Sequence, residues 1–335
     1  MQQLKNRRPR ELDTRRYYDR PAAVLSWTDE GEIGEQVACA QLQHIFLGHV
    51  VRFQGKADKG LDLVFTGMSP CHQKPLLHFV AQVKTGQSQV VRLGDIIKAK
   101  RVNAKRLLEW KRLEAPVLFL WVNPCNSIIH WSLVNKDNRS GSIFLSRSRF
   151  LCPATPYDFI VMLNRQRTPS SPSINGNELR PPSRIVLKDY ALDYYAKNLL
   201  RTMIENPIVG DVAFTWAGWR HMVRRRHTQA ETNRSLALLP LASAVLEDPS
   251  AISNFRRIGR NARGKITTES RLIAFRRERV TIIGRAPANI VVVVRERLVY
   301  PTNWRSVFHY QDKMIRDLTF CSIYEETDEK RLRAR

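Results

Sequence analysis

The sequence predicts an α/β protein with two domains: an α/β sandwich that contains a mixed sheet, and a basic α+β domain linked to it. Helical and strand-like apolar patterns alternate in the first half of the chain. Residues 165–183 are rich in Pro, Ser, Asn and Gly without apolar periodicity, which is typical of a linker. A length of 335 residues is sufficient for two domains, each with its own core.

The elements of the first half follow from periodicity. Residues 1–24 are rich in Arg and Pro and predict a flexible basic arm before a domain at 25–164. Ile33, Val37 and Gln41 share one helical stripe, so a half-buried helix is expected there. The expected order then continues with strands at 49–53, 61–66 and 76–84, a Lys/Arg-rich helix at 94–113, and strands at 116–122 and 128–133.

The second domain is expected at 184–335. Its predicted elements are helices at 190–205 and 216–239, the latter interrupted near Thr228, and strands at 272–275, 280–283, 290–294 and 318–324. Between Arg220 and Arg297 there are 17 Lys/Arg against 6 Asp/Glu. We therefore expect this domain to bind nucleic acid or a protein partner.

Charge and cysteine usage limit the classes of function. The net charge of +24 predicts a polyanionic partner, with nucleic acid as the first candidate. A charge of this size destabilises the fold by self-repulsion, so it indicates a use in binding. No basic amphipathic anchor supports a membrane partner, and no apolar stretch approaches eighteen residues. The five cysteines lack a Cys-x-x-Cys pair and the N-terminus lacks an apolar signal region, so a cytoplasmic protein is expected.

Polar residues at the end of the strand at 76–84 suggest a built site. Gln82 and Lys84 project from one strand face, and Asp62 opens the preceding strand. Phosphodiester hydrolysis requires hard cations with oxygen ligands, which Asp62, Gln82 and the main-chain carbonyl of Val83 can supply to Mg²⁺ or Mn²⁺. Lys84 can orient or deprotonate water or stabilise the phosphorane, and Glu35 can add a bridging or outer carboxylate.

These residues resemble a known superfamily. Ile33-Gly34-Glu35, Gly60-Leu61-Asp62 and Gln82-Val83-Lys84 look like the PD-(D/E)XK nucleases, in the branch where Gln replaces the second acid. Together with residues 116–122 and Trp131, they look more narrowly like the prokaryotic domain-of-unknown-function family 4365, over about residues 28–160. The resemblance implies a restriction-endonuclease-like sandwich and a metal-dependent deoxyribonuclease of restriction or anti-phage defence.

Basic residues near both domains are candidate nucleic-acid contacts. In the first domain they are Lys98, Lys100, Arg101 and Lys105, and in the second they are Trp219, Arg220, Arg224 and Arg225. His221 shares a predicted helix face with Arg224 and Arg225. That face can grip a nucleic-acid backbone with Trp stacking on bases, dock an acidic partner, or place His221 as a general base for RNA cleavage.

Several alternatives stay open. The helix carrying His221, with Ser322 and Tyr324 on a C-terminal strand, is weakly similar to barnase–EndoU–colicin–RelE-like nucleases, so a two-domain effector with a metal-independent ribonuclease is one alternative. A non-catalytic nucleic-acid-binding regulator is another. Asp62 can also be a turn cap, Lys84 a solvated strand end and Glu35 an exposed helix residue. A homodimer and a protein partner from a defence system are compatible with the sequence.

Overall fold

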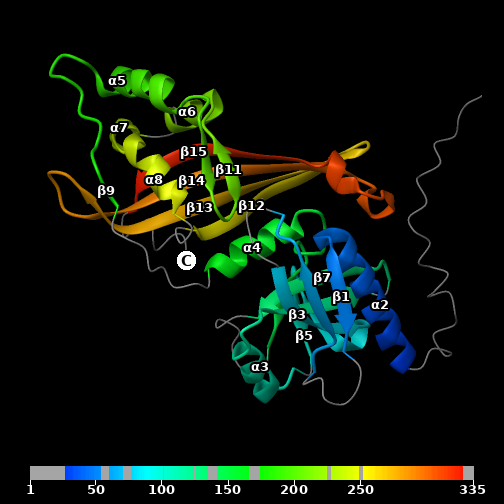
Figure 1. Ribbon diagram of the computed structural model, residues 1–335. Coiled ribbons are helices and arrows are strands. Elements are labelled where there is room, and N and C mark those ends of the chain that lie inside the picture. The colour runs from blue at the N-terminus through cyan, green and yellow to red at the C-terminus, as the bar shows by residue number, and fades with distance from the viewer. Residues whose placement is uncertain are drawn as a thin grey trace, which may run out of the picture. The chain divides into compact units, whose positions relative to one another are not determined.

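The computed structural model describes residues 27–53, 60–70, 77–100, 102–123, 125–134, 142–165, 174–224, 228–248 and 252–326. The predicted basic arm lies outside these residues. They form two compact units that divide the chain after Pro156, whereas the sequence suggested a boundary at 164. Each unit combines helices with a mixed sheet, so the predicted α/β class is confirmed (Figure 1).

A five-stranded sheet in the order β1-β2-β3-β6-β7 forms the centre of the first unit. Its strands are β1 (Gly48–Arg52), β2 (Leu63–Gly67), β3 (Leu77–Thr85), β6 (Val117–Asn123) and β7 (Ile128–Val134). β3 and β6 are parallel, and the other neighbouring pairs are antiparallel. β6 is buried along its whole length, as expected for a central strand covered on both faces.

Helix α2 (Trp27–Phe46) covers one face of this sheet. The Phe46 ring lies 5.4 Å from the Phe65 ring and 5.3 Å from the Phe79 ring, which anchors the C-terminal end of the helix. Near its N-terminal end, a Cβ at Gly34 would lie 1.7 Å from Thr85 Oγ1. Glycine is therefore required for α2 to approach the end of β3 this closely.

Helix α3 and a small sheet cover the other face. α3 (Ala104–Lys111) buries Leu107 and Trp110 in a core shared with Val80 and Phe119. The small sheet contains β4 (Val90–Leu93), β5 (Ile96–Ala99) and β8 (Phe144–Ser146). Since Val80, Gln82 and Lys84 lie two positions apart on β3, they project from the same face of the strand, which is the face that packs on α3.

The helix predicted at 94–113 is wrong in its first half. Residues 94 and 95 form the turn of a hairpin between β4 and β5, and Leu93 pairs with Ile96. Gly94 has φ +58°, which glycine adopts without steric cost. The two-residue Gly-Asp connection between apolar runs is a hairpin signal that outweighs the helical pattern around it.

A second sheet, in the order β10-β11-β15-β14-β13-β12, forms the second unit, with β9 pairing β13 off this path. Its strands are β9 (Asn175–Gly176), β10 (Met203–Asn206), β11 (Gly210–Ala213), β12 (Ile252–Arg263), β13 (Ile266–Ile282), β14 (Ala288–Pro301) and β15 (Ile315–Glu325). The strands predicted at 272–275 and 280–283 are one long strand, β13, and β12 was not predicted. Arginines interrupt the apolar pattern of both strands, at Arg256, Arg257, Arg260 and Arg263 in β12 and at Arg271, Arg276, Arg277 and Arg279 in β13.

The helices of the second unit are α5 (Leu187–Tyr194), α6 (Trp216–Met222), α7 (Gln229–Ala237) and α8 (Ala242–Glu247), and α4 (Thr155–Arg165) enters it at Tyr157. The predicted interruption near Thr228 is confirmed, because Thr228 caps α7 in a capping box with Glu231. The helix predicted at 190–205 ends earlier: a π-helical turn, Tyr195–Leu199, follows α5, and β10 begins at Met203.

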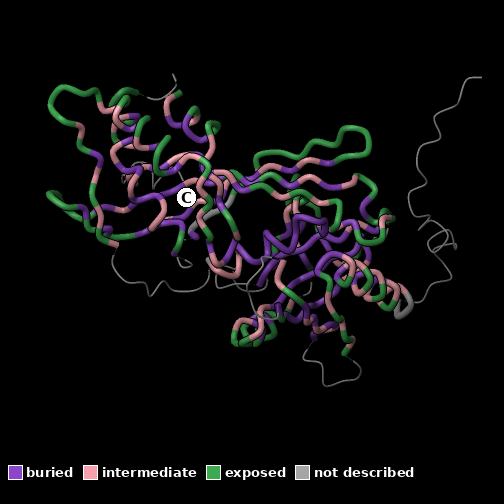
Figure 2. The backbone as a smooth tube through the Cα atoms, turned by 45° about the horizontal axis from the view of Figure 1, so that its top comes forward, coloured by how far each residue is buried: buried purple, intermediate pink, exposed green. Residues whose placement is uncertain are grey.

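The predicted linker is partly structured. Residues 166–173 lie outside the described residues, but Leu179 is buried and its N–H donates to the Ala237 carbonyl at 2.8 Å. Residues 175 and 176 form β9 beside β13. The later part of the linker therefore belongs to the second unit. The turn between β12 and β13 is exposed, as is the part of β12 that precedes it, residues 258–263 (Figure 2).

Candidate functional site

The backbone of Asp62 is held between two neighbouring segments. Its N–H donates to the Ala81 carbonyl and its carbonyl accepts from the Phe53 N–H, both at 2.9 Å. Leu63 pairs with Ala81 in the antiparallel register, so Asp62 lies opposite Gln82. The predicted proximity of Asp62 and Gln82 is therefore a direct result of the β2–β3 pairing.

The side chains of Asp62 and Gln82 meet the main chain of Val83. Asp62 Oδ2 accepts a hydrogen bond from the Val83 N–H at 2.6 Å and another from Gln82 Nε2. Gln82 Nε2 also donates to the Val83 carbonyl at 2.9 Å, and only 2% of Gln82 is exposed. Asp62 Oδ2 and the Val83 carbonyl oxygen thus both point at one nitrogen.

This arrangement fits a hard cation in its donor set. Mg²⁺ and Mn²⁺ prefer carboxylate and carbonyl oxygens, and two such oxygens converge here. The Gln82 amide can add a third oxygen donor. Within the described part of the chain, no group of three or more His, Cys, Asp or Glu side chains could hold a metal ion, so this site differs from an all-acid cluster.

Lys84 lies two positions beyond Gln82 on the same face of β3 and is half-buried. Its neighbour on β6 is Trp121, whose Nε1–H donates to the Gly86 carbonyl at 3.0 Å. This hydrogen bond fixes the chain immediately after β3. Lys84 consequently lies beside Gln82 on β3 and next to Trp121 of β6.

The structure does not place Glu35 beside Gln82 and Lys84. Glu35 lies on α2 and forms an ion pair of 2.8 Å with Arg52, on the face of the sheet opposite to Gln82. A different acid of α2 lies nearer the end of β3. A Cβ at Gly86 would be 2.8 Å from Glu30 Oε1, so the Glu30 carboxylate rests against the residue that follows this strand. Glu30 lies four residues before Gly34 and so shares its helix face. This spacing is the sequence feature that could have indicated Glu30 as a site residue.

The basic candidates of the first unit are spread around α3. Lys98 lies on β5, Lys100 follows it, and Lys105 is exposed on α3, while Arg101 lies outside the described residues. Arg106 is placed closer to Asp62: a Cβ at Gly60 would be 2.4 Å from Arg106 Nη1, and Gly60 has φ +72°. A guanidinium group therefore packs on the turn that leads into Asp62.

In the second unit, Trp219 is a core residue. It is 7% exposed and its ring lies 5.5 Å from the Tyr195 ring, so in this conformation it does not offer a stacking surface for bases. Arg220 and Arg224 are exposed, and Arg225 lies outside the part of the chain that is described. Trp216, 45% exposed, is the accessible aromatic residue of α6.

His221 is half-buried on α6. This helix packs on the face of β15 that carries the Phe320 side chain, because a Cβ at Gly218 would lie 3.2 Å from Phe320 Cδ1. Ser322 pairs with Val293 and Phe320 with Val294, so Ser322 and Tyr324 point to the other face. The structure thus does not gather these residues on one face.

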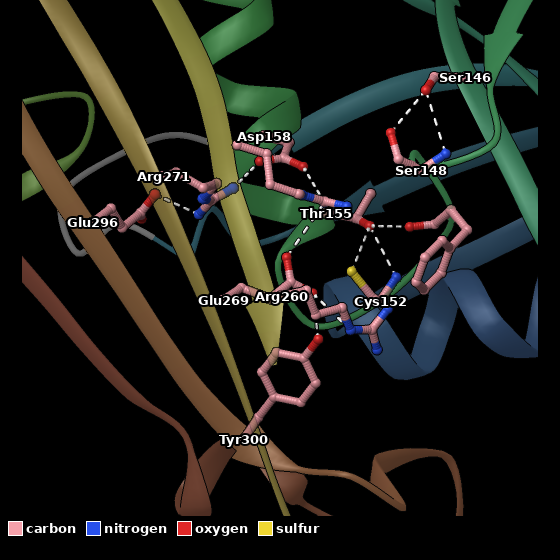
Figure 3. A network of polar contacts seen from close by, with 12 residues as sticks. Ser146, Ser148, Cys152, Thr155, Asp158, Arg260, Glu269, Arg271, Glu296 and Tyr300 are labelled. Atoms are coloured by element: carbon pink, nitrogen blue, oxygen red, sulfur yellow. Dashed lines mark hydrogen bonds and ion pairs between the residues drawn. The ribbon is translucent and has the colours of Figure 1, made fainter. Parts of the chain in front are cut away.

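A buried network of charges in the second unit was missed by sequence reasoning (Figure 3). Arg271, 1% exposed, forms ion pairs with Asp158 and with Glu296. Glu296 also accepts from Arg316 Nε at 2.5 Å. Since these partners are far apart in sequence, no local pattern indicated them.

The same network continues through Glu269 (Figure 3). Tyr300 Oη donates to Glu269 Oε1 at 2.5 Å, and Arg257 and Arg260 lie 3.4 and 3.5 Å from this carboxylate. Asp158, Glu269, Arg271 and Glu296 are almost completely buried, so they are not accessible to a substrate. We assign the network to fixing α4 on the sheet.

No match was found when the chain was compared with protein-family models, curated proteins and solved structures. Across the described ranges, none of the helices has the length and apolar character that crossing a membrane requires.

Proposed function

We propose that the first unit is a metal-dependent endonuclease that hydrolyses DNA phosphodiester bonds. The observation that carries this proposal is the convergence of Asp62 Oδ2 and the Val83 carbonyl oxygen on the Gln82 amide, with Lys84 next on the same strand face. Asp62, Val83 and Gln82 would hold Mg²⁺ or Mn²⁺, which supplies charge neutralisation at phosphorus and a more acidic water. Cation binding requires Gln82 to present its amide oxygen.

The other residues have roles that follow from their positions. Lys84 would orient or deprotonate the attacking water or stabilise the phosphorane. Glu30 provides a carboxylate beside the end of β3, the role that the sequence suggested for Glu35. Arg106, beside the turn before Asp62, would hold a backbone phosphate. The helix–strand–strand–strand–helix–strand order of α2, β1, β2, β3, α3 and β6, with β4 and β5 inserted before α3, is consistent with this proposal.

The biological setting rests on the resemblance alone. Restriction or anti-phage defence in the cytoplasm is the role we propose, with a protein partner of the defence system as the trigger.

A non-catalytic nucleic-acid-binding protein is the second candidate. It is favoured by the hydrogen bond from Gln82 Nε2 to Asp62, which satisfies the carboxylate without a cation. The ion pair that holds Glu35 away from Gln82 also supports it. A neutral glutamine in place of an acid lowers the charge available to a divalent cation.

Plasmid nicking separates the two candidates. Purified protein is incubated with supercoiled DNA in Mg²⁺, in Mn²⁺ and in EDTA, together with the variants Asp62→Asn and Lys84→Ala. We expect nicking that needs metal and is lost in both variants, while the control Lys188→Ala, at an exposed lysine of α5 in the second unit, stays active. DNA binding without nicking would favour the second candidate, and nicking that persists in EDTA or in Asp62→Asn would exclude the first.

A further inference from the structure

The four-stranded part of the second sheet has one buried face and one open face. Arg271, Ile273 and Phe275 of β13 are buried on one face, and the intervening residues are only half-buried. β14 alternates in the same way. The buried face is the one that helices contact, because Asp158 of α4 pairs with Arg271, and Asp248, which follows α8, pairs with Arg277. We call the opposite face of β12 to β15 the outer face.

Two cross-strand rows form the centre of the outer face. The pairing register aligns Arg256, Leu272, Arg295 and Thr319 in the first row. It aligns Gly259, Ser270, Arg297 and Asp317 in the second. Three exposed arginines and one exposed acid thus lie in these rows, and the remaining positions hold Leu272, Thr319, Gly259 and Ser270.

The arginines are spaced for an extended polyanion. Arg256 and Arg295 lie on strands separated by one strand, so their Cα atoms are roughly 10 Å apart across the sheet. Arg295 and Arg297 lie two positions apart on β14, about 7 Å along the strand. The hydroxyls of Thr319, next to Arg295, and of Ser270, next to Arg297, can donate to further phosphate oxygens.

Protection of the sheet edge does not explain this charge. β12 is an edge strand, and positive charges on an edge discourage pairing with other chains. Arg295 and Arg297, however, lie on β14, which has neighbours on both sides. An interior strand needs no such protection. Arg297 pairs with Asp317 of β15, so it is Arg295 that requires another reason.

We propose that the outer face binds the phosphate backbone of double-stranded DNA. The two rows contain no aromatic side chain on which a base of a single strand could stack, and arginines with hydroxyls are suited to phosphates. Binding of this kind is insensitive to sequence and strongly dependent on salt. The choice of DNA rests on the function proposed for the first unit, but the binding itself needs no catalysis.

The test measures binding of the full chain to a fluorescent DNA duplex in EDTA, over a series of KCl concentrations. The variant Arg256→Gln/Arg295→Gln removes one charge from each side of the first row, and Arg297 is kept because it pairs with Asp317 at 3.0 Å. The matched control, Lys188→Gln/Arg234→Gln, removes two exposed charges from α5 and α7. Melting temperatures verify that both variants fold.

We expect the outer-face variant to bind about tenfold more weakly, with a slope of log K against log salt smaller by about 2. The control should bind like the unmodified chain. Equal losses in both variants, no loss in the outer-face variant, or binding of a single strand but not of the duplex would overturn the proposal. Binding is measured in EDTA, where cleavage is suppressed, so this test does not depend on catalysis. A chain that binds duplex DNA but never nicks it would reject the proposed nuclease activity and leave the proposed DNA-binding face standing.

Discussion

Asp62 accepts a 2.6 Å hydrogen bond from the main-chain N–H of Val83, a residue on the neighbouring strand β3. The carboxylate is thereby fixed to the strand that also carries Gln82 and Lys84. The carbonyl of the same Val83 accepts from Gln82, so both main-chain groups of one residue frame the site. Precise placement of donors in this way is what a site for a cation or a phosphate requires.

Replacing Gln82 by Glu tests whether this site binds a cation. The substitution brings a second carboxylate against Asp62 and removes the donated hydrogen bond, so in EDTA it should destabilise the first unit by about 1–3 kcal/mol. Mg²⁺ would neutralise both carboxylates. We therefore expect Mg²⁺ to raise the melting temperature of Gln82→Glu more than that of the unmodified chain, as measured by thermal unfolding.

The matched control is Gln36→Glu, the same substitution at an exposed position of α2. Its melting temperature should respond to Mg²⁺ like that of the unmodified chain. Equal responses of the two variants would mean that no cation binds between Asp62 and residue 82.

The roles of Glu30 and Glu35, two of the acids of α2, can be distinguished by replacing each with its amide. Glu35 pairs with Arg52 at 2.8 Å with both side chains partly exposed, so Glu35→Gln should cost less than about 1 kcal/mol of stability and preserve nicking. Glu30 lies against Gly86 at the end of β3, so Glu30→Gln should reduce the nicking rate about tenfold or more. A loss of nicking in Glu35→Gln alone would place Glu35 in the site instead.

The part of the site that could be predicted from the sequence follows from strand periodicity and from the pairing of strands that are consecutive in the chain. Gln82 and Lys84 share a strand face because the side-chain period of a strand is two, and Asp62 meets them because β2 and β3 pair directly. The orientation of Glu35 could not be predicted in this way, since it depends on an ion pair with Arg52 on another element.

Contacts between residues distant in sequence explain the remaining differences between the predicted and the observed structure. Arg271 lies in an arginine-rich segment that resembles a solvated strand, yet Asp158 and Glu296 neutralise it in the interior. Trp219 occurs among arginines and suggested a stacking platform, but Tyr195 packs against it. In each case a partner distant in sequence decides burial, and periodicity carries no information about that partner.

Burial of Trp219 predicts a large effect on stability. Trp219→Ala should leave a cavity beside Tyr195 and cost about 3–5 kcal/mol. Trp216→Ala, at a 45% exposed position of the same helix, is the control and should cost much less. Urea unfolding followed by circular dichroism measures both. Similar costs for the two variants would contradict the core assignment of Trp219.

The buried network predicts a strong dependence on Arg271. Arg271→Met leaves the carboxylates of Asp158 and Glu296 without this partner in the interior, which should destabilise the second unit by about 3–5 kcal/mol. Arg297→Met is the control, because Arg297 is 55% exposed in its pair with Asp317 and should contribute less than about 1 kcal/mol. Comparable free energies of unfolding for the two variants would show that the network is not structural.

Glu296 predicts the pH dependence of the second unit. Burial alone raises the pKa of this carboxyl, but the charges of Arg271 and Arg316 outweigh it and hold the pKa below its usual value. A depressed carboxyl pKa contributes stability that is complete above the unfolded value of about 4.3 and is lost as the pH falls through the folded value. We therefore expect the unmodified chain to lose stability below about pH 4.3, as measured by urea unfolding at a series of pH values.

Two variants test this assignment. Glu296→Gln should be less stable at pH 7, but its free energy of unfolding should fall less on acidification. Asp317→Asn removes an exposed acid on the neighbouring strand, and its stability should follow that of the unmodified chain. An unchanged pH dependence in Glu296→Gln would show that its ionisation does not contribute to folding.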